Sequence, residues 1–152
     1  MIFYIRNFFF AYIATIGFAI LFNTPKSVLL KTGFGGAIGW GLYSYLNHIT
    51  GNIVLATFIA SFFIALIGEI FAITDRKPIT VFIIPGIVPL VPGFGIYFTM
   101  LSILEQNYER AAQYGSEALL ISIAIAGALT IVLSLNSYRK QLQQKSYKTP
   151  FK

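Results

Sequence analysis

The chain has 152 residues, of which 57% are hydrophobic and 11% are charged. Soluble proteins carry about 25% charged residues, and a soluble domain of this size has too little interior to bury so many apolar side chains. The composition therefore predicts a membrane protein. The net charge is +6. The basic residues lie at the ends of apolar runs, where they set the orientation of a protein in the membrane, so we do not expect the chain to bind nucleic acid.

The first three apolar segments each predict a helix, and a membrane-spanning helix needs roughly 20 mostly apolar residues. Residues 2–22 form the first segment. The second helix is expected from Pro25 to about His48, because proline suits the first turn of a helix. Asn52 is a suitable N-cap for a third helix over residues 53–74.

A fifth helix is predicted near the end of the chain. Residues 105–117 are polar and predict a loop, and Ser116 is a suitable N-cap for a helix from Glu117 to about residue 137. Residues 139–152 are basic and polar and are expected to lack regular structure. The predicted fold is therefore an all-α, polytopic membrane domain over residues 1–138, with about five transmembrane helices, followed by a basic cytoplasmic tail.

Basic residues predict the orientation of these helices. If the N-terminus lies outside, Arg6 and Arg110 are outside and the other nine of the 11 basic residues are inside. This asymmetry satisfies the positive-inside rule. It predicts a plasma-membrane protein with a cytoplasmic C-terminus. The nine inside residues are Lys26, Lys31, Arg76, Lys77, Arg139, Lys140, Lys145, Lys148 and Lys152.

The fourth apolar segment, residues 79–104, contains three prolines and two glycines within nine residues. Proline removes a backbone donor and clashes with the preceding turn. Backbone left without partners at membrane depth is tolerated only inside protein or beside a wet cavity. Two interpretations stay open: a broken helix that lines a substrate path, or a kinked helix packed against its neighbours. On the first, the candidate path residues are Pro85, Gly86, Pro89, Pro92, Gly93, Tyr97 and Thr99.

Small residues follow a four-residue spacing in the second predicted helix. Such spacing allows helix backbones to approach closely. Packing within the chain, contact with another chain and the lining of a pore are all consistent with it. The residues concerned are Gly33, Gly35, Ala37, Gly39 and Gly41.

Glu69 is an acid inside the third predicted helix. An ionisable group in a membrane span faces the protein interior or water by default and is a functional candidate. Glu69 is therefore a candidate for ion or proton coupling. The alternative is a structural ion pair with Arg76 or Lys77, which follow it closely in sequence.

No motif in the sequence indicates an enzyme, a cofactor or a metal site. The chain has no cysteine and a single histidine, which excludes thiolate zinc sites and cysteine nucleophiles. It also lacks a Walker loop, a G-x-G-x-x-G fingerprint and a G-x-S-x-G elbow. The sequence therefore predicts a protein that is not an enzyme and carries no cofactor.

Four stretches of the chain carry a resemblance to a known family: residues 17–25, 58–61, 78–93 and 97–100. The third, PITVFIIPGIVPLVPG, is the most specific. They resemble the threonine/serine exporter family in its small-subunit branch, which includes the small component of a bacterial succinate exporter. The resemblance implies a second, larger membrane subunit and export of amino acids or dicarboxylates driven by an ion gradient.

Together these observations predict the small subunit of a two-component membrane exporter of small carboxylate-bearing metabolites. Its expected partners are the larger subunit, the lipid bilayer and the substrate. Two alternatives stay open. The chain is an accessory or regulatory membrane subunit that does not line the substrate path, or a small homo-oligomeric channel.

Overall fold

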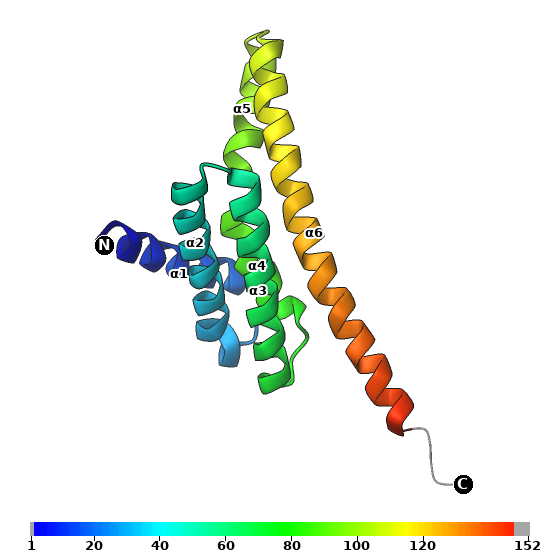
Figure 1. The fold of residues 1–152 in the computed structure, drawn as a ribbon. Helices are drawn as coiled ribbons and strands as arrows, with labels where there is room; N and C mark the ends of the chain where they lie inside the picture. The colour runs from blue at the N-terminus through cyan, green and yellow to red at the C-terminus, as the bar shows by residue number, and fades with distance from the viewer. Residues whose placement is uncertain (1, 148–152) are drawn as a thin grey trace.

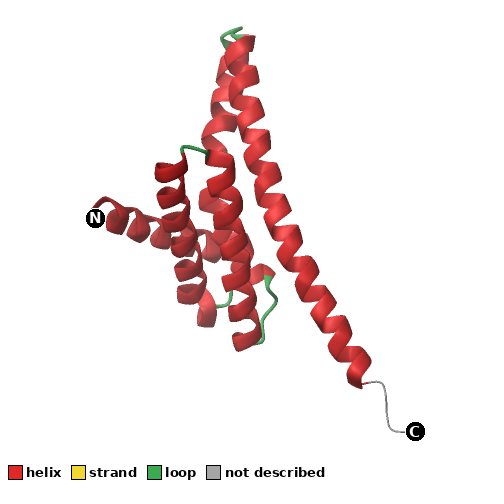
Figure 2. Ribbon diagram, viewed as in Figure 1, coloured by secondary structure: helices red, strands yellow, loops and turns green. Residues whose placement is uncertain are grey.

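The computed structural model describes the backbone of residues 2–147 and the side chains of residues 5–137. All regular structure in this part of the chain is helical, as Figure 2 shows, and the predicted all-α class is confirmed. Two short 3₁₀ helices, η1 and η2, cover Lys26–Val28 and Val88–Leu90. The α-helices are α1 (Ile2–Leu21), α2 (Leu29–Thr50), α3 (Ile53–Asp75), α4 (Thr80–Ile87), α5 (Gly93–Leu104) and α6 (Tyr108–Tyr147).

The helices form a bundle from which one hairpin projects. The helices α2, α3 and α4 pack together, and α1 crosses α2 in Figure 1. The long helix α6 packs first along α5 and then along α3. The α5–α6 hairpin extends past the ends of α2 and α3 (Figure 1). Helix α5 therefore packs chiefly on α6, whereas the other helices support one another.

The ends of α3 follow the predicted signals. The Asn52 side chain accepts a hydrogen bond of 3.0 Å from the backbone N–H of Leu55, so the predicted N-cap is confirmed. The helix ends at Asp75, and Arg76 adopts a left-handed conformation with φ 52°. The backbone N–H of Lys77 donates to the carbonyl of Ala72 at 3.1 Å, which closes the helix end.

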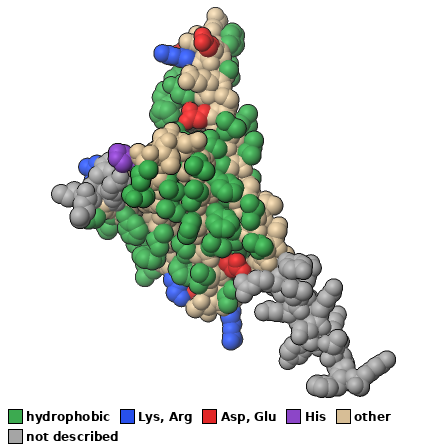
Figure 3. All heavy atoms as spheres, viewed as in Figure 1, with side chains coloured by type: hydrophobic (Ala, Val, Ile, Leu, Met, Phe, Trp, Pro, Cys, Tyr) green, Lys and Arg blue, Asp and Glu red, His purple; other side chains and the backbone are tan. Residues whose placement is uncertain are grey.

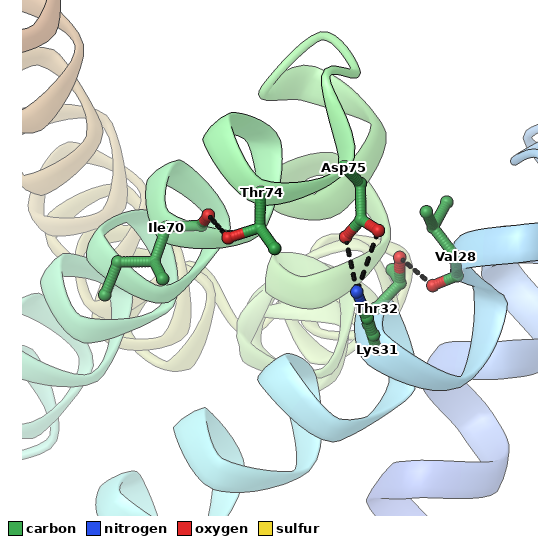
Figure 4. Close-up of polar contacts among 6 residues, drawn as sticks. All are labelled: Val28, Lys31, Thr32, Ile70, Thr74 and Asp75. Carbon is green, nitrogen blue, oxygen red and sulfur yellow. Dashed lines mark hydrogen bonds and ion pairs between the residues drawn. The ribbon is translucent and has the colours of Figure 1, made fainter.

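An ion pair ties the first turn of α2 to the last turn of α3. The Lys31 Nζ atom lies 2.8 Å from both carboxylate oxygens of Asp75 (Figure 4). Beside it, the Thr32 hydroxyl donates to the carbonyl of Val28 and is fully buried. Lys31 and Asp75 are 44 residues apart, so this pair joins two helices that meet at one end of the bundle.

Glycines bring α2 close to both of its neighbours. A Cβ atom built on Gly33 would lie 2.6 Å from Cγ1 of Ile16 in α1. A Cβ atom built on Gly39 would overlap the side chain of Ile64 in α3. Neither glycine can accept a side chain unless its neighbour moves. These contacts favour packing within the chain for the small-residue face Gly33, Gly35, Ala37, Gly39 and Gly41.

The predicted start of the last helix was wrong. Helix α6 begins at Tyr108, about nine residues earlier than the predicted Glu117. Its cap is Asn107, whose side chain accepts a 3.1 Å hydrogen bond from the N–H of Arg110. The Ser116 hydroxyl instead donates to the carbonyl of Gln113 within the helix. Polar residues were interpreted as a loop, but they form the exposed first turns of a capped helix.

The tail also departs from the prediction of no regular structure. Helix α6 continues without a break to Tyr147. Straight-chain residues such as lysine and glutamine favour a helix. They continue the helix that the preceding apolar part of α6 forms against α5 and α3. The remaining predicted tail, residues 148–152, lies outside the described residues.

Two helices of the described chain are long and apolar enough to cross a membrane: α3 and the part of α6 from Tyr108 to Ser137. A third crossing is added if the bent pair α4–η2 and α5 counts as one span. Hydrophobic side chains cover the middle of the face in Figure 3, and the charged ones lie mainly toward its ends. The structure therefore supports two to three spans, and the five-span topology stays a prediction.

The break in the fourth apolar segment falls between Leu90 and Gly93, within the proline-rich run. Pro85, the first of the three prolines, lies inside α4. Helix α4 has only eight residues, so Pro85 interrupts little of it. The chain turns after η2, and the two halves of the segment are bent by 49°. Pro89 lies in η2, and Pro92 is the N-cap of α5.

A candidate substrate cavity

A cavity of about 370 Å³ lies beside this bend. Its walls come from η2, the first turn of α5, and parts of α2, α3 and α6. Pockets that hold small molecules have volumes of about 300–1,000 Å³, so this one suits a small metabolite. The lining residues are Trp40, Tyr43, Ile53, Thr57, Pro89, Leu90, Val91, Pro92, Gly93, Phe94, Gly95, Tyr114, Glu117, Ala118 and Ile121.

The bend itself provides backbone donors to the cavity wall. Ile96 makes the first hydrogen bond of α5, from its N–H to the carbonyl of Pro92 at 3.1 Å. The amides of Phe94 and Gly95 precede that bond, and α5 has no side-chain cap. The N-terminal turn of a helix carries a partial positive charge and free N–H groups. The amide of Gly93 donates to the carbonyl of Val91 at 2.8 Å, so the part of the wall suited to a negatively charged group is formed by residues 94 and 95.

Three of the predicted path residues meet at this cavity. Pro89, Pro92 and Gly93 all line it. The other four candidates do not line the cavity. Pro85 lines a different pocket, beside the loop after α1. Gly86 is buried, and a Cβ atom built on it would lie 3.0 Å from Cγ2 of Ile64.

The remaining two path candidates lie farther along α5. Tyr97 is 61% exposed on the outside of the helix. Thr99 lines a smaller pocket between α5 and α6, where its hydroxyl donates to the carbonyl of Gly95 at 2.7 Å. The seven candidate path residues therefore do not share one cavity and lie at several separate surfaces of the structure.

Sequence reasoning missed the side chains that face the bend from other helices. Trp40 and Tyr43 come from α2, with ring centroids 5.2 Å apart, and Glu117 comes from α6. In a helix that starts at Tyr108, the spacing of Tyr114, Glu117, Ala118 and Ile121 places these residues on one face. The predicted helix began at Glu117, so this pattern became visible only once the true start of α6 was known.

Glu69 lies away from this cavity, on the buried side of α3. It is 8% exposed, and it does not line the 370 Å³ cavity. The described ion pair at that end of α3 belongs to Asp75, one and a half turns later. Glu69 is therefore a buried acid of a largely apolar helix, and the choice between a coupling role and a structural role stays open.

Small, buried side chains of α3 lie between the cavity and Glu69 along the helix. Thr57 lines the cavity, and Ser61 and Ala65 follow at intervals of four residues. All three are fully or almost fully buried. The Oγ atom of Ser61 has no hydrogen-bond partner within the described structure. The helix thus keeps small and hydroxyl side chains on the face that continues from the cavity.

An apolar, all-helical chain with a cavity beside a broken helix pair has the features of a membrane transporter. The family model described as Threonine/Serine exporter, ThrE, matches residues 7–135. The chain therefore belongs to the threonine/serine exporter family, and the resemblance found in the sequence is confirmed. This is a family of transporters and not of enzymes. No solved structure matches the chain.

Proposed function

We propose that the chain is the small subunit of a two-component exporter of small carboxylate-bearing metabolites, and that its 370 Å³ cavity lies on the substrate path. The observation that carries the proposal is the coincidence of two features. The family match covers almost the whole helical part of the chain, and the proline-rich run 78–93 places Pro89, Pro92 and Gly93 in a cavity wall.

The proposed location is the plasma membrane, with the N-terminus outside and the C-terminus in the cytoplasm. A second, larger membrane subunit of the same family would complete the transporter. Support comes from the apolar outer surface of the α5–α6 hairpin, which the rest of the chain leaves exposed. Five of its exposed residues are Phe94, Met100, Leu104, Leu119 and Ile123. Lipid and a partner subunit are the surfaces that can cover them.

Deletion of this chain should abolish export. The measurement is efflux of labelled threonine, serine and succinate from loaded cells of the native host, with and without the gene, and after complementation. A tagged copy should purify with a larger membrane protein. Export at the wild-type rate by this chain alone in liposomes would contradict the need for a partner, and unchanged efflux in the deletion strain would refute the proposed function.

Glu69→Gln tests whether the buried acid takes part in ion coupling. The substitution keeps the shape of the side chain and removes its charge. If Glu69 binds the coupling ion, efflux should fall at least about tenfold, as expected for loss of a charged contact worth about 1.4 kcal/mol or more. Glu105→Gln, at the exposed end of α5, is the matched control and should export normally.

The structural alternative for Glu69 makes a different prediction. If its role is an ion pair near the end of α3, the double variant Arg76→Gln with Lys77→Gln should reproduce the loss. Wild-type efflux in Glu69→Gln at normal membrane abundance would end the coupling hypothesis.

A further inference from the structure

The cavity beside the bend contains one formal charge, and that charge is negative. Among its described lining residues, Glu117 is the only acid, and none is lysine, arginine or histidine. Glu117 forms no ion pair within the described part of the chain. Glu117 is half-buried among apolar and aromatic side chains, and a cation or a donor beside it would offset the loss of water around its carboxylate. The cavity therefore favours a positively charged group beside Glu117.

The aromatic walls have the same preference. Trp40 and Tyr43 line the cavity from α2, and Phe94 and Tyr114 line it from α5 and α6. The face of an aromatic ring attracts an ammonium group, tryptophan most strongly. Two independent features of the walls, a carboxylate and aromatic rings, thus favour a cation. The cavity volume of about 370 Å³ limits that cation to a small molecule.

The backbone at the bend favours an anion, which is the opposite of the preference of Glu117 and the aromatic rings. The first turn of α5, with its free amides at Phe94 and Gly95, lies in the same lining as Glu117. Such a turn attracts an anion. A molecule that carries an ammonium group and a carboxylate on one carbon satisfies both walls. A dicarboxylate satisfies only one and meets repulsion at the other.

We propose that Glu117, with Trp40 in the same cavity lining, binds the α-ammonium group of the substrate and makes this cavity selective for amino acids over dicarboxylates. This inference rests on the proposed function and assigns its site. It separates the two substrate classes that the family resemblance leaves open. Glu117 is then a residue that determines specificity, and the first turn of α5, which begins after Pro92, lies in the same cavity lining.

The experiment compares threonine with 3-hydroxybutyrate, which is threonine without its ammonium group, and with succinate. Efflux of each is measured in the deletion strain complemented with wild type, Glu117→Gln, Glu117→Asp or Glu109→Gln. Glu109 lies in the exposed first turn of the same helix, outside the cavity, and serves as the matched control. Binding of the same three compounds to the purified full chain, followed by thermal shift, gives a second readout.

Glu117→Gln should weaken threonine binding at least about tenfold, which is the size expected for loss of one charge-assisted contact. Binding of 3-hydroxybutyrate and succinate should stay the same or tighten, so the preference for threonine collapses. Glu117→Asp should retain part of that preference, because it retains the charge. Glu109→Gln should match wild type.

Three results would overturn the assignment. An unchanged preference in Glu117→Gln would show that the ammonium group binds elsewhere, and an equal loss for all three compounds would show a merely structural role. A variant that fails to fold is replaced by Trp40→Leu, which should lower threonine affinity selectively, and equal affinities there would count against the site. If wild type itself fails to restore efflux, the proposed function has failed, whereas normal wild-type efflux with indifferent variants removes only this inference.

Discussion

Gly39→Ala should lower the thermal stability of the purified protein, although alanine is the better helix former. The added Cβ atom would overlap the side chain of Ile64, and overpacking of a filled interior costs about 1–3 kcal/mol. The gain in helix propensity, about 1 kcal/mol, offsets only part of that cost. Thermal unfolding of the full chain in detergent, with membrane abundance, measures the difference.

Gly35→Ala is the matched control for this prediction. It lies one turn earlier on α2, and its added Cβ atom would meet Ile67 at 3.6 Å, an ordinary contact. Its stability should therefore hold or rise. Truncating Ile64 to alanine in the Gly39→Ala background should cost less than the sum of the single changes, because the two sites share one space. Equal stability of the two glycine variants would contradict the close contact between α2 and α3.

The double variant Pro89→Ala with Pro92→Ala should keep the protein folded and lose most of its export. Alanine is preferred over proline in a helix interior by about 3 kcal/mol. Helix can then form across the present bend of 49°. The amides at the start of α5 would turn inward to bond with preceding carbonyls, so the cavity wall loses its donors. Efflux and unfolding temperature should be measured on the same preparations.

Pro78→Ala provides the control for the proline pair. Pro78 is exposed and precedes α4, away from the cavity, so its replacement should leave efflux near the wild-type value. A stable double variant with normal efflux would show that the bend is architectural and that the substrate is held by other residues. Loss of both stability and efflux would show that the bend is needed for folding.

The fold was predictable wherever local signals and hydrophobicity agreed. The apolar run of α3 has a good cap at Asn52 and ends at Asp75, and the predicted range 53–74 matches both boundaries to within one residue. The start of α6 was not, because the polar residues before Glu117 look like a loop when composition alone is considered. Their helical state depends on the cap at Asn107 and on packing against α5, which composition does not reveal.

The site was predictable only along one segment of the chain. Proline chemistry pointed to the bend, and Pro89, Pro92 and Gly93 do line the cavity. Trp40 and Glu117 are 77 positions apart and line the same cavity only because tertiary packing brings their helices together. A single sequence contains no direct record of such a contact, so Glu117 could be ranked as a site residue only after the helices were placed.

Because α6 is longer than a bilayer is thick, we expect transport to depend on the thickness of the bilayer. Its 40 residues extend about 60 Å at 1.5 Å per residue, whereas the hydrocarbon core is about 30 Å thick. Half of the helix must therefore lie in headgroups, water or protein, and hydrophobic mismatch sets which half. Because α6 also supplies Tyr114 and Glu117 to the cavity wall, a thicker or thinner membrane would move that wall relative to the lipid surface. Lipid composition would thus tune how readily the cavity exchanges with water.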